Sequence, residues 1–138
     1  MDKALNYLAL AKKGRLIELG EEPVGAITRA VKGRLVIVAS DASDHTGRRA
    51  KSFVAGTDQQ CLRVPFSKEE LGFVVGRTSL AIAAFTDTAM ALAFVKALPD
   101  QEKVKEVRET LDAKSKKLRQ RKDEAKAHER NVRLGKKK

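Results

Sequence analysis

The chain has 138 residues, of which 42% are hydrophobic, and it carries a formal net charge of +11. This length is typical of one domain, and the apolar fraction is sufficient for a globular core, so a chain that is disordered throughout is excluded. The positive charge favours polyanionic partners, because lysine and arginine release counterions from a phosphate backbone on binding. The single cysteine, Cys61, excludes an internal disulfide and a cysteine-based zinc site.

Helical and extended patterns alternate in the first half of the chain. In order, they predict a helix capped by Asp2 and running to Lys13, a strand over 16–19, a helix with Pro23 in its first turn and Gly33 at its end, a strand over 35–39 and a helix capped by Ser43.

The second half contains the most informative segment, Val64–Asp87. Ser67 and Glu70 have the spacing of a capping box, and Gly76 follows where a left-handed residue is expected after a helix. The flanking strands are predicted over 61–64 and 80–85. The run 80–85 is apolar throughout, which is typical of a strand buried on both faces. A last helix of the domain is expected from Thr86-Asp87 to Leu98, ended by Pro99.

This alternation predicts an α/β fold, specifically a three-layer α/β/α sandwich around a four-stranded mixed, mostly parallel sheet. We expect residues 1–99 to form this domain, because the composition changes after Pro99. Residues 100–138 carry 15 Lys+Arg against 8 Asp+Glu, a net charge of +7. They are predicted to be a basic charged tail, helical at first and then disordered, with charge concentrated in 114–122 and Lys136–Lys138.

The order valine-proline, capping box, Leu71-Gly72, Gly76 and Thr86-Asp87 around a buried strand resembles one family. Further similar segments are Ala9–Arg15, Gly20–Val24 and Leu35–Ser43. The chain resembles the kink-turn-binding ribosomal proteins of the archaeal L-seven-Ae type, and more closely their small bacterial YlxQ-like branch. The resemblance implies a monomeric, non-catalytic protein without a cofactor that binds structured RNA, in particular ribosomal RNA. Separately, the first residues lack the apolar block of a secretory signal, which predicts a cytoplasmic location.

The resemblance places the RNA-binding segment at Gly20, Glu21 and Glu22, at the change from strand to helix. The family motif is Gly-x-Asn-Glu-x-x-Lys, and from Gly20 only the glycine matches, with Ala26 at the lysine position. Arg29, three residues further on the same side of the helix, can substitute for that lysine. Alternatively, the two glutamates only favour the positive end of the helix.

Gly76 and Arg77 open the loop before the last strand, which in the resembling proteins helps to hold the RNA backbone. Arg77 is therefore a candidate phosphate contact. The alternative is a glycine that ends a helix, followed by a solvated arginine. The aromatic residues, Phe73 among them, are mostly at core spacings, which favours a folded RNA target over a single strand.

Two other classes of function stay open. The first is a protein-interaction module associated with translation that has lost specific kink-turn recognition, with Leu111 and Leu118 able to dock on a partner. The second is an enzyme at the polar loop from Ser40 to His45, but the cap at Ser43 explains that loop better. We expect no membrane segment, no metal and no small-molecule substrate.

Overall fold

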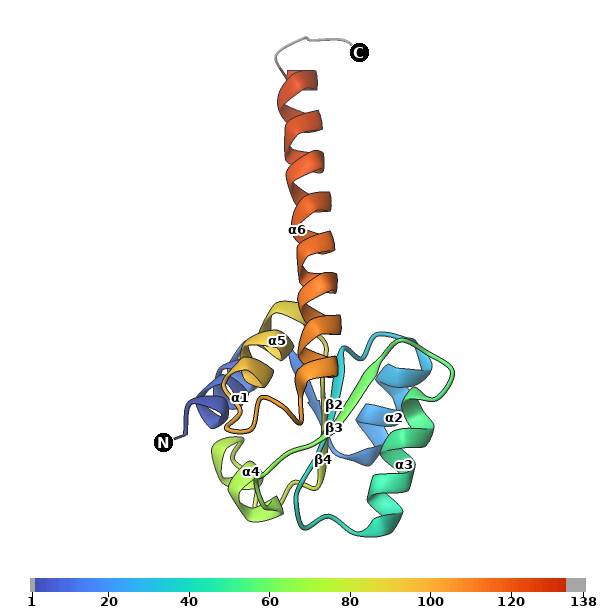
Figure 1. Ribbon diagram of the computed structural model, residues 1–138, viewed down its shortest axis with the longest axis vertical. Helices are drawn as coiled ribbons and strands as arrows, with labels where there is room; N and C mark the ends of the chain where they lie inside the picture. Colours follow the sequence, from blue (N-terminus) through green and yellow to red (C-terminus); the bar gives the residue numbers. More distant parts are fainter. Residues whose placement is uncertain (1, 134–138) are drawn as a thin grey trace.

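The computed structural model describes residues 2–133, and the side chains of residues 2–128. Its elements are α1 (Lys3–Lys13), β1 (Ile17–Leu19), α2 (Glu21–Arg29), β2 (Leu35–Val38), α3 (Asp44–Val54), β3 (Gln60–Arg63), α4 (Lys68–Val74), β4 (Ile82–Phe85), α5 (Thr88–Lys96) and α6 (Lys105–Arg133). Figure 1 shows α1, α4 and α5 on one side of the sheet and α2 and α3 on the other. The predicted α/β class is confirmed.

The four strands form one mixed sheet in the order β1-β4-β2-β3. Only β2 and β3 pair in parallel, whereas β4 is antiparallel to both of its neighbours, β1 and β2. The prediction of a mostly parallel sheet is therefore wrong. The strands β1, β2 and β3 do run in one direction, as their helical connections suggested, but β4 lies between β1 and β2 and runs against them.

The short connection through α4 explains the direction of β4. The last residue of β3, Arg63, and the first of β4, Ile82, both pair with Val38, so the chain leaves and re-enters the sheet at the same end. The amide of Leu80 donates to the carbonyl of Lys68 at 2.9 Å, so the segment before β4 is bonded back to the start of α4. A chain that re-enters where it left must run back along the sheet.

The predicted helix starts are confirmed by their hydrogen bonds. The side chains of Asp2, Ser43, Ser67 and Asp87 each accept from a backbone amide two or three residues further on. At α4 the capping box is complete, because Glu70 also accepts from the amide of Ser67 at 3.0 Å. Each cap satisfies an amide that has no partner within its helix.

The end of α2 differs from the prediction that Gly33 ends this helix. The helix ends at Arg29, and Val31, not Gly33, takes the left-handed conformation, with φ of 55°. Gly33 instead donates its amide to Gln59 Oε1 at 2.8 Å, and a Cβ at Gly33 would lie only 2.9 Å from that oxygen. The absence of a side chain at Gly33 thus allows the loop after α2 to approach Gln59 closely.

Val31→Gly is expected to increase the free energy of unfolding by about 0.5–1 kcal/mol. A left-handed conformation costs an L residue about 1–2 kcal/mol, whereas the flexibility of glycine costs about 0.5–1 kcal/mol. Val31 is 48% exposed, so little packing is lost. Chemical denaturation measures the change. The neighbouring Ala30→Gly, at φ of −82°, should destabilise the protein instead; a loss in both variants would contradict strain at Val31.

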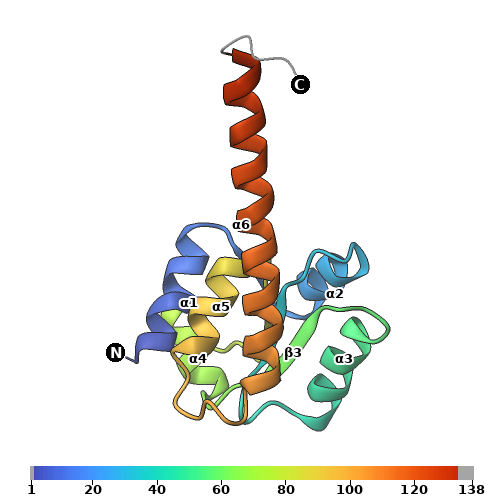
Figure 2. The same cartoon turned by 45° about the horizontal axis from the view of Figure 1, so that its top comes forward.

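The helix α6 begins in the core and then leaves the domain. Val104, just before it, and Leu111 are 5% and 0% exposed, whereas Leu118 is 41% exposed. In Figure 2 the later turns of α6 extend beyond the domain. Val104 and Leu111 are therefore part of the apolar core, which excludes Leu111 as an exposed docking residue. Lys136–Lys138 lie outside the described residues.

No helix among the described residues is both long enough and apolar enough to cross a membrane.

Candidate nucleic-acid interface

Gly20 lies between β1 and α2 in a conformation that L residues rarely adopt, with φ of +97°. Its amide donates to the carbonyl of Ile82, the first residue of β4, at 3.0 Å. A Cβ on Gly20 would lie 3.6 Å from Nη1 of Arg77, so nothing separates this backbone from the guanidinium. The structure therefore brings together two predicted site residues that are far apart in the sequence.

The position of Arg77 depends on two glycines of α4 and its following loop. Gly76 has φ of +77°, which confirms the predicted left-handed residue after α4. The amide of Arg77 then donates to the carbonyl of Gly72 at 2.8 Å. A Cβ on Gly72 would lie 2.8 Å from the Arg77 carbonyl oxygen and from the amide nitrogen of Ser79. Only a glycine at position 72 allows this loop to pack against α4.

Glu21 forms an ion pair that the sequence did not predict. Its Oε1 accepts from Nε of Arg49, on α3, at 2.7 Å. The guanidinium of Arg49 also lies over the ring of Phe53, 4.9 Å from the ring centroid. Because the two residues are 28 positions apart, no local pattern relates them. The ion pair is exposed, so its effect is to orient both side chains more than to stabilise the fold.

Glu22 and Arg29 lie beside this pair on the same face of α2. Together with Glu21, Gly25, Arg49 and Phe53 they line a shallow depression of about 360 Å³. Gly25 makes the close packing possible, since a Cβ there would lie 3.3 Å from both the Arg29 guanidinium and the Phe53 ring. The six predicted residues thus form two groups around α2. Gly20 and the side chain of Arg77 meet at its start, with Gly76 next to Arg77 in the chain, and Glu21, Glu22 and Arg29 are along its outer face.

Phe73, on α4, is 78% exposed, although its spacing suggested a core position. The core side of α4 is occupied by Leu71 and Val75, which are 0% and 7% exposed. Phe73 points to the other side, four residues before Arg77 in the chain. A large aromatic side chain with this exposure is a candidate for contact with a partner.

The polar loop before α3 has structural roles. Oδ1 of Asp41 accepts from the backbone amide of Lys68 at 2.8 Å, and Oγ of Ser43 accepts from the amide of Thr46 at 3.2 Å. Burial raises the pKa of the Cys61 thiol, which disfavours a reactive thiolate. Among the described residues, no three histidine, cysteine or acidic side chains are grouped so that they could hold a metal ion.

No protein-family model matches the sequence. The RNA-binding protein YlxQ of Enterococcus faecium is 32% identical to this chain over 75 residues, which cover 54% of this chain and 72% of that protein. This chain belongs to the YlxQ family.

Two solved structures share the fold of this YlxQ family member. A protein of unknown function from Bacillus halodurans has a TM-score of 0.66 at 23% identity, covering 72% of this chain and 100% of that one. The 15.5kD RNA binding protein of Giardia lamblia has a TM-score of 0.51 at 19% identity, covering 69% of this chain and 84% of that one. At these identities the likeness shows the fold alone.

Proposed function

We propose that this chain is a non-catalytic RNA-binding protein of the ribosome or its assembly that recognises structured, kink-turn-like RNA at the start of α2. The observation that carries the proposal is the approach of the Arg77 guanidinium to the bare backbone of Gly20. The family relationship supports it, because the Enterococcus faecium relative is named an RNA-binding protein.

The start of α2 suits an RNA phosphate for three reasons. The first amides of a helix lack partners within the helix, and the helix dipole makes this end positive. Gly20 has no side chain to keep a phosphate away from these amides. Arg77 adds a full charge and several hydrogen-bond donors beside them.

The outer face of α2 would then meet the base edges. Glu21 is neutralised by Arg49, which lowers its repulsion of the RNA backbone. Glu22 is left to accept hydrogen bonds from bases, and Arg29 can donate to a guanine O6 in place of the family's lysine. Phe73 adds a flat exposed surface on which an unpaired base can stack. These roles account for binding although the family motif is incomplete.

Arg77→Ala, Arg29→Ala and Glu22→Ala are each expected to weaken binding to a folded kink-turn RNA by about 1–3 kcal/mol. Each side chain is exposed, so the melting temperature of the protein should not change. Isothermal titration calorimetry at one fixed salt concentration measures the effect. Arg48→Ala is the matched control, because it removes an exposed arginine from α3 outside this depression.

Equal losses in Arg48→Ala and Arg77→Ala would show that only net charge matters, which contradicts a defined site. A second measurement compares the kink-turn RNA with the same RNA after its kink is replaced by regular pairs. We expect the unaltered protein to prefer the kinked form. If the protein binds both RNAs equally and Arg77→Ala still weakens binding, structured RNA remains the proposed ligand but the proposal of kink-turn recognition is contradicted.

A protein-interaction module associated with translation is the second candidate function, and one surface favours it. A largely apolar depression of about 350 Å³ lies between β3 and the segment joining α5 to α6. Its apolar lining residues are Leu62, Val64, Pro65, Leu98, Pro99 and Val104. Binding through this surface would depend little on salt, whereas phosphate contacts lose affinity steeply as salt increases.

A further inference from the structure

A second positive surface forms where α6 leaves the domain. Four cations from two separate parts of the chain, which we call the basic collar, surround a shallow depression of about 300 Å³; they are Arg34, Lys114, Lys117 and Arg121. The only carboxylate in the lining is that of Asp58. The segment 114–122 of α6 contributes six lysines and arginines and no acidic residue.

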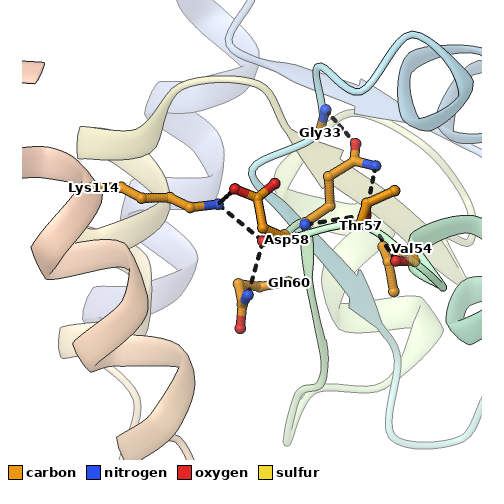
Figure 3. Close-up of polar contacts among 7 residues, drawn as sticks. Gly33, Val54, Thr57, Asp58, Gln60 and Lys114 are labelled. Atoms are coloured by element: carbon orange, nitrogen blue, oxygen red, sulfur yellow. Dashed lines mark hydrogen bonds and ion pairs between the residues drawn. The ribbon is translucent and has the colours of Figure 1, made fainter.

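One cation of the collar holds α6 in place. Nζ of Lys114 lies 3.1 Å from Oδ2 of Asp58 and donates to the Asp58 backbone carbonyl at 2.9 Å (Figure 3). The hydrogen bond and charge of Lys114 hold the pKa of Asp58 below its ordinary value of 3.8. A lowered pKa means that this contact stabilises the folded state above pH 3.8 and loses that contribution as the pH falls further.

The other three cations of the collar have no direct ion-pair partner among the described side chains. Arg34, Lys117 and Arg121 form no ion pair with any carboxylate among residues 2–128. Lys117 and Arg121 are exposed, and they lie four positions apart, which places them on the same face of α6. The collar therefore presents a concentrated positive charge to solvent.

The collar lies at the opposite end of the sheet from Gly20. The amide of Arg34 donates to the carbonyl of Phe85, the last residue of β4, at 2.7 Å, whereas Gly20 donates to Ile82, the first. A four-residue strand spans about 13 Å, so one phosphate cannot contact both ends. Beyond the collar, α6 continues to Arg133, about 18 Å further at a rise of 1.5 Å per residue.

The chemistry of the collar fits a phosphate backbone better than a protein surface. Stable protein interfaces need apolar or aromatic anchors in their centre, and the only large apolar side chain lining this depression is Leu118, 41% exposed. A row of unpaired lysine and arginine side chains is instead typical of surfaces that follow nucleic-acid backbones.

We propose that the basic collar is a second phosphate-binding surface, which holds the backbone of a double-stranded nucleic acid independently of the site at Gly20. The inference goes beyond the proposed function, because this surface requires no kink and reads no base. An RNA that reaches both surfaces would contact the protein at two places along its length, the site at Gly20 and the basic collar.

The test measures the affinity of the full chain for a regular 20-base-pair RNA duplex as a function of salt. Lys117→Ala/Arg121→Ala should reduce the slope of log K against log salt by up to about 2, since each lost phosphate contact removes about 0.9. Lys103→Ala/Lys105→Ala removes the same charge from the segment where α6 begins and should leave the slope unchanged. Equal melting temperatures in both variants ensure that only charge has changed.

Asp58→Asn is expected to change the affinity for the duplex in the opposite direction. It removes the only negative charge that lines the depression but keeps the Asp58 carbonyl to which Lys114 donates. We expect tighter duplex binding in this variant. A DNA duplex of the same sequence should also bind, because phosphate contacts do not require the 2′-hydroxyl.

The proposal is overturned if the unaltered chain binds neither duplex, or if the collar variant and its control have the same slope. Binding to polyglutamate but not to duplexes would overturn it in favour of an acidic protein partner. Arg77→Ala separates the two proposals: it should weaken binding to kinked RNA and leave the regular duplex unaffected. If Arg77→Ala has no effect on either ligand, the proposed function fails and the collar proposal stands.

Discussion

Leu111→Ala is expected to lower the free energy of unfolding by about 2–5 kcal/mol, the range for removing a fully buried leucine and leaving a cavity. Leu111 lies in α6 and is 0% exposed, within the same apolar cluster as Leu8, Phe85 and Phe94. Urea denaturation, followed by circular dichroism, measures the loss. A loss of this size would show that the start of α6 is part of the folded domain.

Leu118→Ala is the matched control, since it removes the same atoms from a side chain that is 41% exposed. We expect it to cost less than 1 kcal/mol, as is usual for surface positions (about ±0.5 kcal/mol). Equal, small losses in both variants would mean that α6 adds nothing to the core, and that residues 1–99 fold alone as the sequence suggested. Because Val104 and Leu111 are buried, we instead propose that truncation after Pro99 unfolds the domain, whereas truncation after Lys122 does not.

Gly72→Ala is expected to destabilise the protein by about 1–3 kcal/mol, the usual cost of inserting a methyl group where there is no space. The new Cβ would lie 2.8 Å from the Arg77 carbonyl oxygen and the Ser79 amide nitrogen, and 2.9 Å from the Ser79 Cα. All three are backbone atoms, so the loop itself must move. Since Arg77 belongs to this loop, RNA affinity should fall as well, even at temperatures where the variant is fully folded.

Gly14→Ala serves as the control for Gly72→Ala. Gly14 has an ordinary φ of −82°, and its nearest neighbours would be 3.4 Å or more from a new Cβ. We expect no loss of stability and no change in RNA binding. If Gly72→Ala is as stable as the unaltered protein, the packing of α4 against its following loop is less tight than the structure indicates.

The features that the sequence predicted correctly depend on residues close together in the chain. The capping box of Ser67 and Glu70 requires only a spacing of three, and the left-handed Gly76 requires only a helix that must end. The buried β4 was recognised for the same reason, since an uninterrupted apolar run is typical of a strand in the interior of a sheet. Exposure is different: Phe73 fits a helical pattern, but tertiary packing decided which side of α4 faces the core.

By itself, then, the sequence determined where the helices of the first 99 residues begin, where the four strands lie along the chain, most of the helix caps and the excess of positive charge near the C-terminal end. Tertiary structure alone decided that β4 enters between β1 and β2, because a strand's neighbours depend on the path of the whole chain and not on its own residues. That placement also puts the loop of Arg77 beside Gly20. The ion pair of Glu21 with Arg49 and the docking of Lys114 on Asp58 are likewise contacts between distant segments, at separations of 28 and 56 residues, for which no local spacing rule exists.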